Sequence, residues 1–270
     1  MTAPLKTVVK KLPGSTQMIR AKDQLADRLR VRQQFLDFAE MAEGKDDRFA
    51  LDWEQRWLCL NDNRATTSFD RHYLYHMAWA SRKLAERRPS EHHDFSSHLH
   101  FATMVCGFVP TTLYEFRPPT IELEGLTCAS ADLTRLSMPD ASLRSVSTMH
   151  VVEHLGLGRY GDPIDPRADL AAMRELQRVL APGGDLYFVV PVGKPRLAFN
   201  SCRVYSYKQV RDAFASLDLV EFALVEDDHT RLPLVRHADP SRVAEQDYAC
   251  GCFHFAKPAE TTSDHTGDAR

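Results

Sequence analysis

The feature that most constrains the fold of this 270-residue chain is an apolar run at residues 185–193, DLYFVVPVG. Leu186–Val190 are apolar without interruption, which is typical of a strand buried on both faces of a sheet. The preceding stretch, residues 169–184, has the spacing of an amphipathic helix and stops at a Pro-Gly-Gly sequence. Its apolar face is formed by Leu170, Met173, Leu176, Val179 and Leu180. A helix that leads into a doubly buried strand predicts a parallel sheet with helices on both faces.

The same alternation of strands and helices extends from Pro89 to residue 257. A short strand and a helix are expected within residues 92–108, and another helix at 206–217. Further strands are expected within residues 110–116, 125–132, 142–152, 219–228 and 248–257. The sequence therefore predicts an α/β fold with a doubly wound, mostly parallel, seven-stranded Rossmann-like sheet and right-handed crossovers.

Four segments are expected along the chain. Residues 1–19 contain Pro and Gly without periodicity and predict a flexible arm, and residues 258–270 are polar and predict a disordered tail. Residues 20–89 predict a helical extension, with one amphipathic helix over 20–43 and a second from an Asp70 N-cap to the residue before Pro89. Residues 90–257 hold the α/β domain. The aromatic helices of the extension suit either a lid or an interface between copies of the chain.

Composition excludes several classes of function. A net charge of −3 offers no basic face for nucleic acid, and no apolar run approaches the ~20 residues of a membrane span. The first 15 residues lack the apolar core of a secretory signal, and the six cysteines show no C-x-x-C pair. We therefore expect a cytoplasmic protein with reduced thiols that acts on a small molecule.

Residues 150–154, HVVEH, can be read as a zinc-hydrolase motif of the H-x-x-E-H type. In that motif two histidines hold the metal from one face of a helix, and the glutamate acts on water. Val146, Ser147 and Thr148 before the motif and the glycines after it disfavour a helix here. A strand end followed by a loop is the better interpretation of the stretch.

Acidic residues stand at the expected ends of three successive strands. Asp94 ends the first, and Glu115 follows at about the 20-residue interval at which an acid meets ribose hydroxyls in dinucleotide folds. Asp132 ends the third, where a carboxylate can accept a hydrogen bond from an adenine amino group. Ligands of open parallel sheets bind beyond these strand ends, so their order along the chain favours a nucleotide-like cofactor.

Two segments carry a resemblance to a known family. The stretch ADLTRLSMPDASLRSVSTMHVVEHL, followed by RELQRVLAPGGDLYFVVPV, resembles the second half of class I S-adenosylmethionine-dependent methyltransferases of the type 11 kind. The stretches HYLYHMAWASRKLAE, HHDFSS and EHLGLGRYGDPIDP are similar to an uncharacterised domain-of-unknown-function family related to those enzymes. The similarity covers about residues 65–257 and implies S-adenosylmethionine as the cofactor.

The resemblance implies roles for four cofactor-binding residues, and Ser96 is a fifth candidate from its position in the turn. Asp94 would begin the cofactor loop, Glu115 would hold the ribose, and Asp132 and Leu133 would flank the adenine. The chain departs from the family in its first turn, where Phe95-Ser96-Ser97-His98 replaces the usual glycine-rich sequence. Ser96 is small enough for a close approach of the backbone to the cofactor.

The chemistry is expected at the loop after residue 149. Methyl transfer to oxygen or nitrogen benefits from a base, and the candidates are His150, Glu153, His154 and Asp162. Arg159 could orient an anionic acceptor through its planar guanidinium beside Tyr160, or it could pair with Asp162 to shape the loop. Other candidates for the acceptor pocket lie beyond the long apolar strand: Asn200, Arg203 and Tyr205.

The leading interpretation is a methyltransferase for a small-molecule or sugar-type acceptor, which requires no metal. One alternative is a non-catalytic binding or scaffold protein that keeps the sheet without the cofactor chemistry, suggested by the missing glycine turn. Another is a zinc hydrolase that uses His150, Glu153 and His154. A nicotinamide oxidoreductase ranks lower because no G-x-G-x-x-G follows the first strand.

Overall fold

The computed structural model describes residues 15–45, 48–60, 62–63, 65–228 and 234–259. These residues belong to two compact units, Met1–Ser68 and Phe69–Arg270. Most of the expected arm and tail, residues 1–14 and 260–270, lies outside the described residues. The expected domain boundary at residue 90 differs from the structure, because the second helix of the extension packs on the sheet and belongs to the second unit.

The first unit contains a long helix, α2 (Ser15–Ala42), and a short 3-10 turn, η1 (Trp53–Gln55). The helix begins five residues before the expected start at residue 20. The ring of Trp53 meets Phe35 edge-on at 5.1 Å between centroids, and the guanidinium groups of Arg32 and Arg56 lie over its faces. Among the described parts of the chain, no helix is long and apolar enough to cross a membrane.

The second unit is built on a seven-stranded sheet in the order β3-β2-β1-β4-β5-β9-β8. The strands are β1 (His92–Phe95), β2 (Thr111–Glu115), β3 (Leu126–Ser130), β4 (Leu143–Met149), β5 (Leu180–Val192), β8 (Asp218–Val225) and β9 (Ala249–Ala256). The first five strands pair in parallel, and β9 is antiparallel to both of its neighbours. The predicted doubly wound, mostly parallel Rossmann-like sheet is confirmed.

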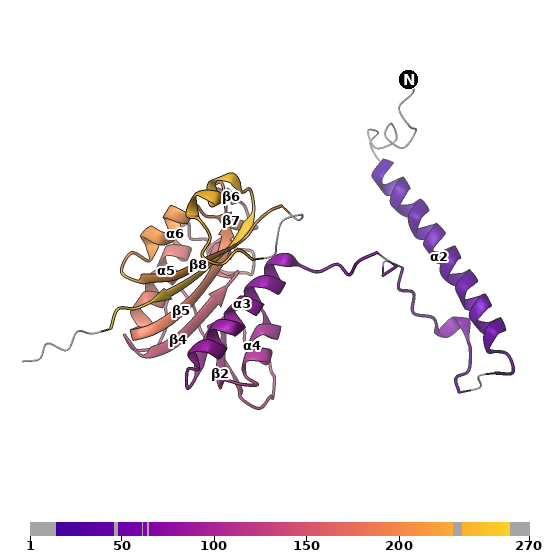
Figure 1. Ribbon diagram of the computed structural model, residues 1–270, viewed down its shortest axis with the longest axis horizontal. Coiled ribbons are helices and arrows are strands. Elements are labelled where there is room, and N and C mark those ends of the chain that lie inside the picture. Colours follow the sequence, from indigo (N-terminus) through magenta and orange to yellow (C-terminus); the bar gives the residue numbers. More distant parts are fainter. Residues whose placement is uncertain (1–14, 46–47, 61, 64, 229–233, 260–270) are drawn as a thin grey trace, which may run out of the picture. The chain divides into compact units, whose positions relative to one another are not determined.

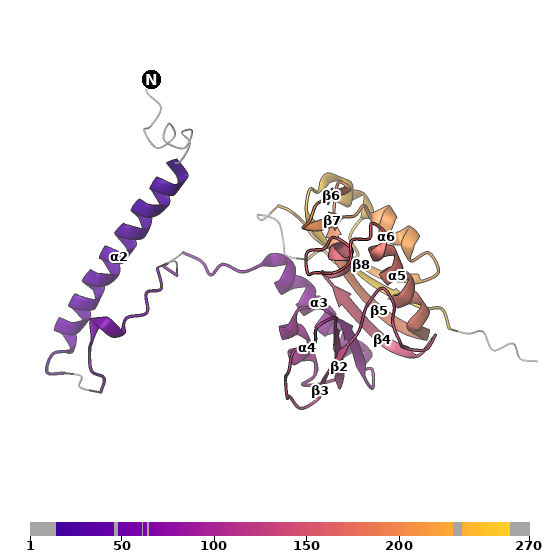
Figure 2. The same ribbon diagram turned by 180° about the vertical axis from the view of Figure 1, so that it is seen from behind.

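Helices cover both faces of this sheet (Figures 1 and 2). One face carries α3 (Arg71–Arg87) and α4 (Leu99–Val105), and the other carries α5 (Ala168–Val179) and α6 (Tyr207–Ala213). The side chains of β5 alternate between the two cores: Phe188 and Val190 pack with Met173 and Phe214, whereas Val189 packs with Trp79. This alternation explains the uninterrupted apolar run, because both faces of β5 are buried.

Two boundaries differ from the predictions. The helix expected to end at Pro-Gly-Gly ends at Val179, and β5 already begins at Leu180, which pairs with Leu143. The register of this pairing shifts before Ser145 meets Asp185, so the Pro-Gly-Gly sequence fills an irregular part of the strand. A small hairpin that the sequence did not indicate, β6 (Arg196–Ala198) with β7 (Cys202–Val204), follows β5.

Glu221 of β8 fixes α3 on the sheet. Its buried carboxylate accepts hydrogen bonds from Trp79 Nε1 at 3.1 Å, from Lys83 Nζ at 2.5 Å and from the Arg236 guanidinium at 2.7 and 2.9 Å. Burial alone would raise the pKa of Glu221, but the bonds from Arg236, Lys83 and Trp79 outweigh it and lower the pKa to about 2. The ionised carboxylate therefore stabilises the folded state.

We expect Glu221→Gln to lower the free energy of unfolding by about 3 kcal/mol at neutral pH, because it removes the buried carboxylate that lies nearest to the buried Lys83 cation. The folded-state pKa lies below the ordinary value of 4.5, so this stabilisation is complete above about pH 4.5 and is lost as the pH falls towards 2. Urea unfolding of both proteins across this range measures the difference.

Glu86→Gln is the matched control for that substitution. Glu86 contacts the same lysine at 3.6 Å, but its side chain is 56% exposed. We expect it to change the free energy of unfolding by less than about 0.5 kcal/mol. Equal losses for the two variants would contradict the role of Glu221.

Candidate functional site

The turn after β1 lies where the strand order of the sheet reverses. The chain runs outward from β1 to β3 and then crosses to β4 on the other side of β1. Ser96, at the start of this turn, has a φ of 56°, in the left-handed region that favours glycine. Its backbone N–H and its Oγ both donate to the carbonyl oxygen of Tyr114, at 2.9 and 3.1 Å. A serine thus adopts the backbone conformation that the missing glycine would supply.

Asp94 supports this turn from inside the protein. It is fully buried, and its carboxylate accepts hydrogen bonds from the Ser147 hydroxyl and from the backbone N–H of Ser97. The Ser97 hydroxyl oxygen accepts from the N–H of Met149 at 3.0 Å and so joins the turn to the end of β4. Burial raises the pKa of Asp94 to about 7 against the hydrogen bonds from Ser147 and Ser97, which lower it. Asp94 therefore positions the turn rather than presenting its own oxygens at the surface.

The other candidate cofactor residues lie in different environments. Glu115 ends β2 and is half-buried, and burial raises its pKa. Asp132 follows β3, whose last residue is Ser130, and its Oδ1 accepts from the N–H and hydroxyl of Thr134 at 2.9 and 2.6 Å. Leu133 is 6% exposed and packs in the hydrophobic core, so its side chain holds the sheet rather than lining an open edge.

Three of the four candidate bases come together after β4. His150 has a left-handed φ of 58°, and its Nδ1 lies 2.9 Å from Oε1 of the buried Glu153. The same oxygen lies 3.7 Å from Nε2 of His154. The Nδ1–H of His154 donates to the carbonyl oxygen of Ser201 at 2.6 Å, which leaves Nε2 as its basic nitrogen.

Residues 150–154 do not form the helix that the zinc-hydrolase motif needs. Only Val152–His154 are helical, as a single 3-10 turn, η2, and His150 precedes it. Gly156 follows with a φ of +73°, and a Cβ there would lie 2.0 Å from the carbonyl oxygen of Asp165. The glycine allows this close approach and ends the turn, so the two histidines cannot share one helical face.

Asp162, the fourth candidate base, shapes the loop instead. Its carboxylate accepts from the backbone N–H groups of Gly156, Gly158 and Tyr160 at 2.7, 3.3 and 3.1 Å. Burial alone would raise the pKa of Asp162, but these backbone hydrogen bonds lower it, which makes it a poor base. The exposed Arg159 makes different contacts, since its guanidinium lies over the Tyr160 ring and donates to Ser201 O at 3.2 Å.

The candidates beyond β5 divide into two groups. Arg203 donates to the carbonyl oxygen of Leu155 at 2.7 Å and lies 3.5 Å from Asp169, whose carboxylate also accepts from the Tyr205 hydroxyl at 2.9 Å. Burial raises the pKa of Tyr205, and the adjacent Asp169 raises it further. These two side chains therefore tie β7 to η2 and α5 and are not free for an acceptor, whereas Asn200 is exposed.

The sequence did not single out a group of side chains from α3 and β9 that surrounds His150. The His72 ring stacks on both His150 and Tyr248, at 5.6 and 5.3 Å between centroids, and the ring of the buried His76 lies 5.1 Å from that of His150. His72, His150 and Cys250 each direct one ligand atom inward, and these atoms lie within 4.8 Å of one another. Two histidines four residues apart at the start of a predicted helix were the only signal available.

The three neighbouring histidines differ in the direction in which their pKa values are shifted. Burial, together with the neighbouring His150, lowers the pKa of His72 to about 4. The pKa of His76 is also lowered well below its usual range, chiefly by burial. Burial alone would lower the pKa of His150 too, but Cys250 and Glu153 beside it raise it.

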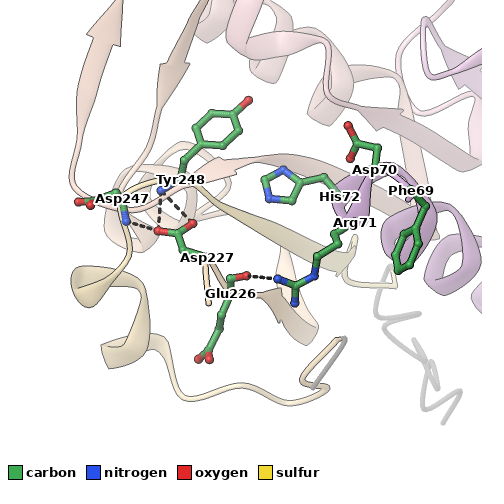
Figure 3. A pocket seen from close by; sticks show the side chains of 8 residues that line it. All are labelled: Phe69, Asp70, Arg71, His72, Glu226, Asp227, Asp247 and Tyr248. Carbon is green, nitrogen blue, oxygen red and sulfur yellow. Dashed lines mark hydrogen bonds between the residues drawn. The ribbon is translucent and has the colours of Figure 1, made fainter. Parts of the chain in front are cut away.

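His72 and Tyr248 reach the surface at a pocket (Figure 3). The pocket is lined by Phe69, Asp70, Arg71, His72, Glu226, Asp227, Asp247 and Tyr248. Asp227 accepts hydrogen bonds from the backbone N–H groups of Asp247 and Tyr248 and thereby fixes the segment that enters β9. The buried cluster around His150 is thus adjacent to an opening at the molecular surface.

The fold and this edge of the sheet define a class: a Rossmann-like α/β protein whose switch point lies between β1 and β4. Residues 137–237 match the model of a family described as Caenorhabditis protein of unknown function, DUF268. This segment includes the His150–Asp162 loop but not the Ser96 turn. The match agrees with the expected similarity to an uncharacterised family. No curated protein matches the chain significantly.

Solved structures similar to this chain include methyltransferases. One is the N-methyltransferase NodS from Bradyrhizobium japonicum in complex with S-adenosyl-L-homocysteine, with 14% identity, a TM-score of 0.48 and coverage of 73% of this chain and 93% of that chain. Another is 1,6-didemethyltoxoflavin-N1-methyltransferase from Burkholderia thailandensis with bound S-adenosylhomocysteine, with 12% identity, a TM-score of 0.47 and coverage of 68% and 79%. Likenesses at 12–14% identity do not establish the activity of this chain.

Proposed function

We propose that the unit from Phe69 onward is an S-adenosylmethionine-dependent methyltransferase that acts on a small-molecule acceptor. The observation that carries the proposal is the Ser96 turn, which has the left-handed backbone of a glycine turn at the switch point of the sheet. Cofactors of open parallel sheets bind at this point, where backbone can approach them closely. Asp94 and Ser97 hold the turn in this shape through their hydrogen bonds to β4.

In this proposal the edge of the sheet beside the turn holds the nucleoside. Glu115 accepts hydrogen bonds from the ribose hydroxyls, and Asp132 accepts from the adenine amino group through the carboxylate oxygen that does not cap Thr134. Burial raises the pKa of Glu115, and no ion pair joins it to a cation among the residues that the structure describes, so its carboxylate can accept from neutral hydroxyls. S-Adenosylmethionine supplies the methyl group when it is bound.

The acceptor would be activated by His154. Its Nδ1–H is committed to Ser201 O, so its Nε2 can take a proton from an acceptor hydroxyl or amine. The carboxylate of the buried Glu153 lies 3.7 Å from this nitrogen and would help to orient the imidazole. The exposed Arg159 and Tyr160 lie beside the His154 ring, and the exposed Asn200 precedes Ser201, to which His154 is bonded. These three side chains would contact a small-molecule or sugar-type acceptor.

The proposal also answers the alternative of a non-catalytic scaffold. That alternative was motivated by the missing glycine turn, and Ser96 has the φ that a glycine would supply. The buried pair of His150 and Glu153 is a further reason to prefer an enzyme, since a buried carboxylate beside a histidine is costly to keep without a use.

Calorimetric titration of the full chain with S-adenosylmethionine and S-adenosylhomocysteine tests the proposal. We expect binding with a Kd of about 1–100 µM, corresponding to roughly 5–8 kcal/mol, and a rise in the unfolding temperature with either compound. Absence of both heat and stabilisation, with folded protein free of copurified cofactor, would favour the scaffold alternative instead.

A further inference from the structure

We propose that His72, His150 and Cys250 form a binding site for Zn²⁺ or a similar divalent transition-metal ion. The three residues come from the first turn of α3, from the end of β4 and from the start of β9. Two imidazole nitrogens and one sulfur are the donor set that such ions prefer. The inference goes beyond the proposed methyl transfer and does not require it.

The geometry brings one donor atom of each residue to a common point. These atoms lie within 4.8 Å of one another, whereas the ligand atoms of a tetrahedral zinc ion lie roughly 3.3–3.8 Å apart, as follows from bonds of about 2.0–2.3 Å. Binding an ion would therefore shorten the distances between the three donor atoms by about 1 Å. His72 is the half-buried residue of the three, so its ring is the one that can move towards the other two. Cys250 and His150 are buried and provide a fixed pair.

The hydrogen bonding of His150 supports a metal ligand. Its Nδ1 is bonded to Glu153 Oε1 at 2.9 Å, and its buried Nε2 has no hydrogen-bond partner among the described residues. A carboxylate on one ring nitrogen and a metal on the other is the usual arrangement of metal-binding histidines. An unpartnered buried nitrogen is otherwise costly, so a ligand at Nε2 explains its presence.

The site would hold the ion with three protein ligands and one open position. His72 lines the surface pocket with Tyr248, so an ion could enter from this side (Figure 3). Coordination would release the proton of the Cys250 thiol to solvent, while His150 would bind through Nε2 and keep the Nδ1 proton that it donates to Glu153. The fourth position could then take water or an oxygen, nitrogen or sulfur atom of a small ligand, as in three-ligand zinc sites.

The test uses the full chain, stripped of metal with a chelator and then titrated with Zn²⁺ and, separately, with Co²⁺. We expect one ion per chain, a higher unfolding temperature with Zn²⁺, and a thiolate-to-cobalt charge-transfer band in the near-ultraviolet. Cys250→Ser should abolish that band, and His72→Gln should weaken affinity by about 100-fold, since loss of a mere outer-shell partner already costs roughly 10–100-fold.

Two matched variants serve as controls. Cys252→Ser changes a buried thiol on the same strand, 3.9 Å from Cys250, and Tyr248→Phe alters the ring stacked on His72 without removing a ligand. Both should bind one ion with little change in affinity. No stoichiometric binding by the wild type, or equal binding by Cys250→Ser and Cys252→Ser, would overturn the proposal.

The same samples separate this proposal from the methyltransferase proposal. S-Adenosylhomocysteine binding is measured with and without the ion. A chain that binds the ion but not the cofactor would support the metal site and count against methyl transfer. A chain that binds the cofactor but no ion would overturn only the metal site.

Discussion

Replacement of Glu115 by alanine is expected to weaken binding of S-adenosylhomocysteine roughly 100-fold, or about 3 kcal/mol. In the proposed complex its carboxylate accepts hydrogen bonds from both ribose hydroxyls. Hydrogen bonds to a charged group contribute about 1.5–3 kcal/mol each. Part of this energy is offset because the half-buried Glu115 carboxylate must give up bound water when the ribose binds. Calorimetry at constant pH measures the change directly.

Glu124→Ala is the matched control for this prediction. Glu124 is an exposed acid just before β3 begins, so it lies near the amino ends of the parallel strands, whereas Glu115 lies at the carboxyl end of β2. Its loss should leave the affinity within about twofold, since it changes only long-range charge. If Glu115→Ala and Glu124→Ala bind equally well, the nucleoside does not lie at the end of β2.

The order of strands and helices could be predicted because the pattern of apolar residues reports burial. The doubly buried β5 reads as a continuous apolar run, and α5 carries one apolar stripe. Segment ends were predicted less well, because local hydrogen bonds decide them. Asp132, expected to end a strand, instead caps the turn after Ser130.

The Ser96 turn illustrates what residue types alone do not show. The absence of glycine suggested a weakened cofactor turn, since only glycine adopts a left-handed backbone without strain. The contacts that stabilise this conformation at Ser96 come from Tyr114, on the neighbouring strand. These contacts form because β1 and β2 are neighbours in the sheet, and the residue types of the turn alone do not reveal which strand lies beside it.

Side-chain direction accounts for the candidate residues that the structure places elsewhere. Arg203 and Tyr205 do follow β5 in sequence, but they turn towards Asp169 in α5. Leu133 turns into the core, and Asp94 turns towards Ser147. Strand ends can be located from sequence, whereas the rotation of each side chain is set by packing between elements.

The cluster of His72, His150 and Cys250 depends on long-range contacts. The three residues lie on separate elements and meet because β9 inserts antiparallel between β5 and β8 while α3 packs over this part of the sheet. In sequence, His150 was instead grouped with Glu153 and His154, its nearest polar neighbours. In the structure Glu153 does contact His150, but the His72 ring stacked on it comes from α3, which is distant in sequence.

Replacement of His154 by glutamine is expected to lower methyl transfer to an oxygen or nitrogen acceptor about 10²–10⁴-fold, the usual effect of losing a general base. Glutamine can still hydrogen-bond to Ser201 O, but it cannot take a proton at the position of Nε2. The measurement is formation of S-adenosylhomocysteine from S-adenosylmethionine with a panel of hydroxyl- and amine-bearing acceptors. For an active acceptor, kcat should fall in the variant while the KM for S-adenosylmethionine stays close to that of the wild type.

Cofactor affinity provides the control for that substitution. His154 lies beyond β4, whereas Ser96, Glu115 and Asp132 are at the ends of β1, β2 and β3, so S-adenosylhomocysteine should bind the variant as tightly as the wild type. A variant that keeps the wild-type rate would remove His154 from the chemistry and leave it with a structural role, holding Ser201 against η2. A variant that loses rate and cofactor affinity together would instead show that His154 supports the cofactor site, because a proton acceptor for the second substrate should change only the rate.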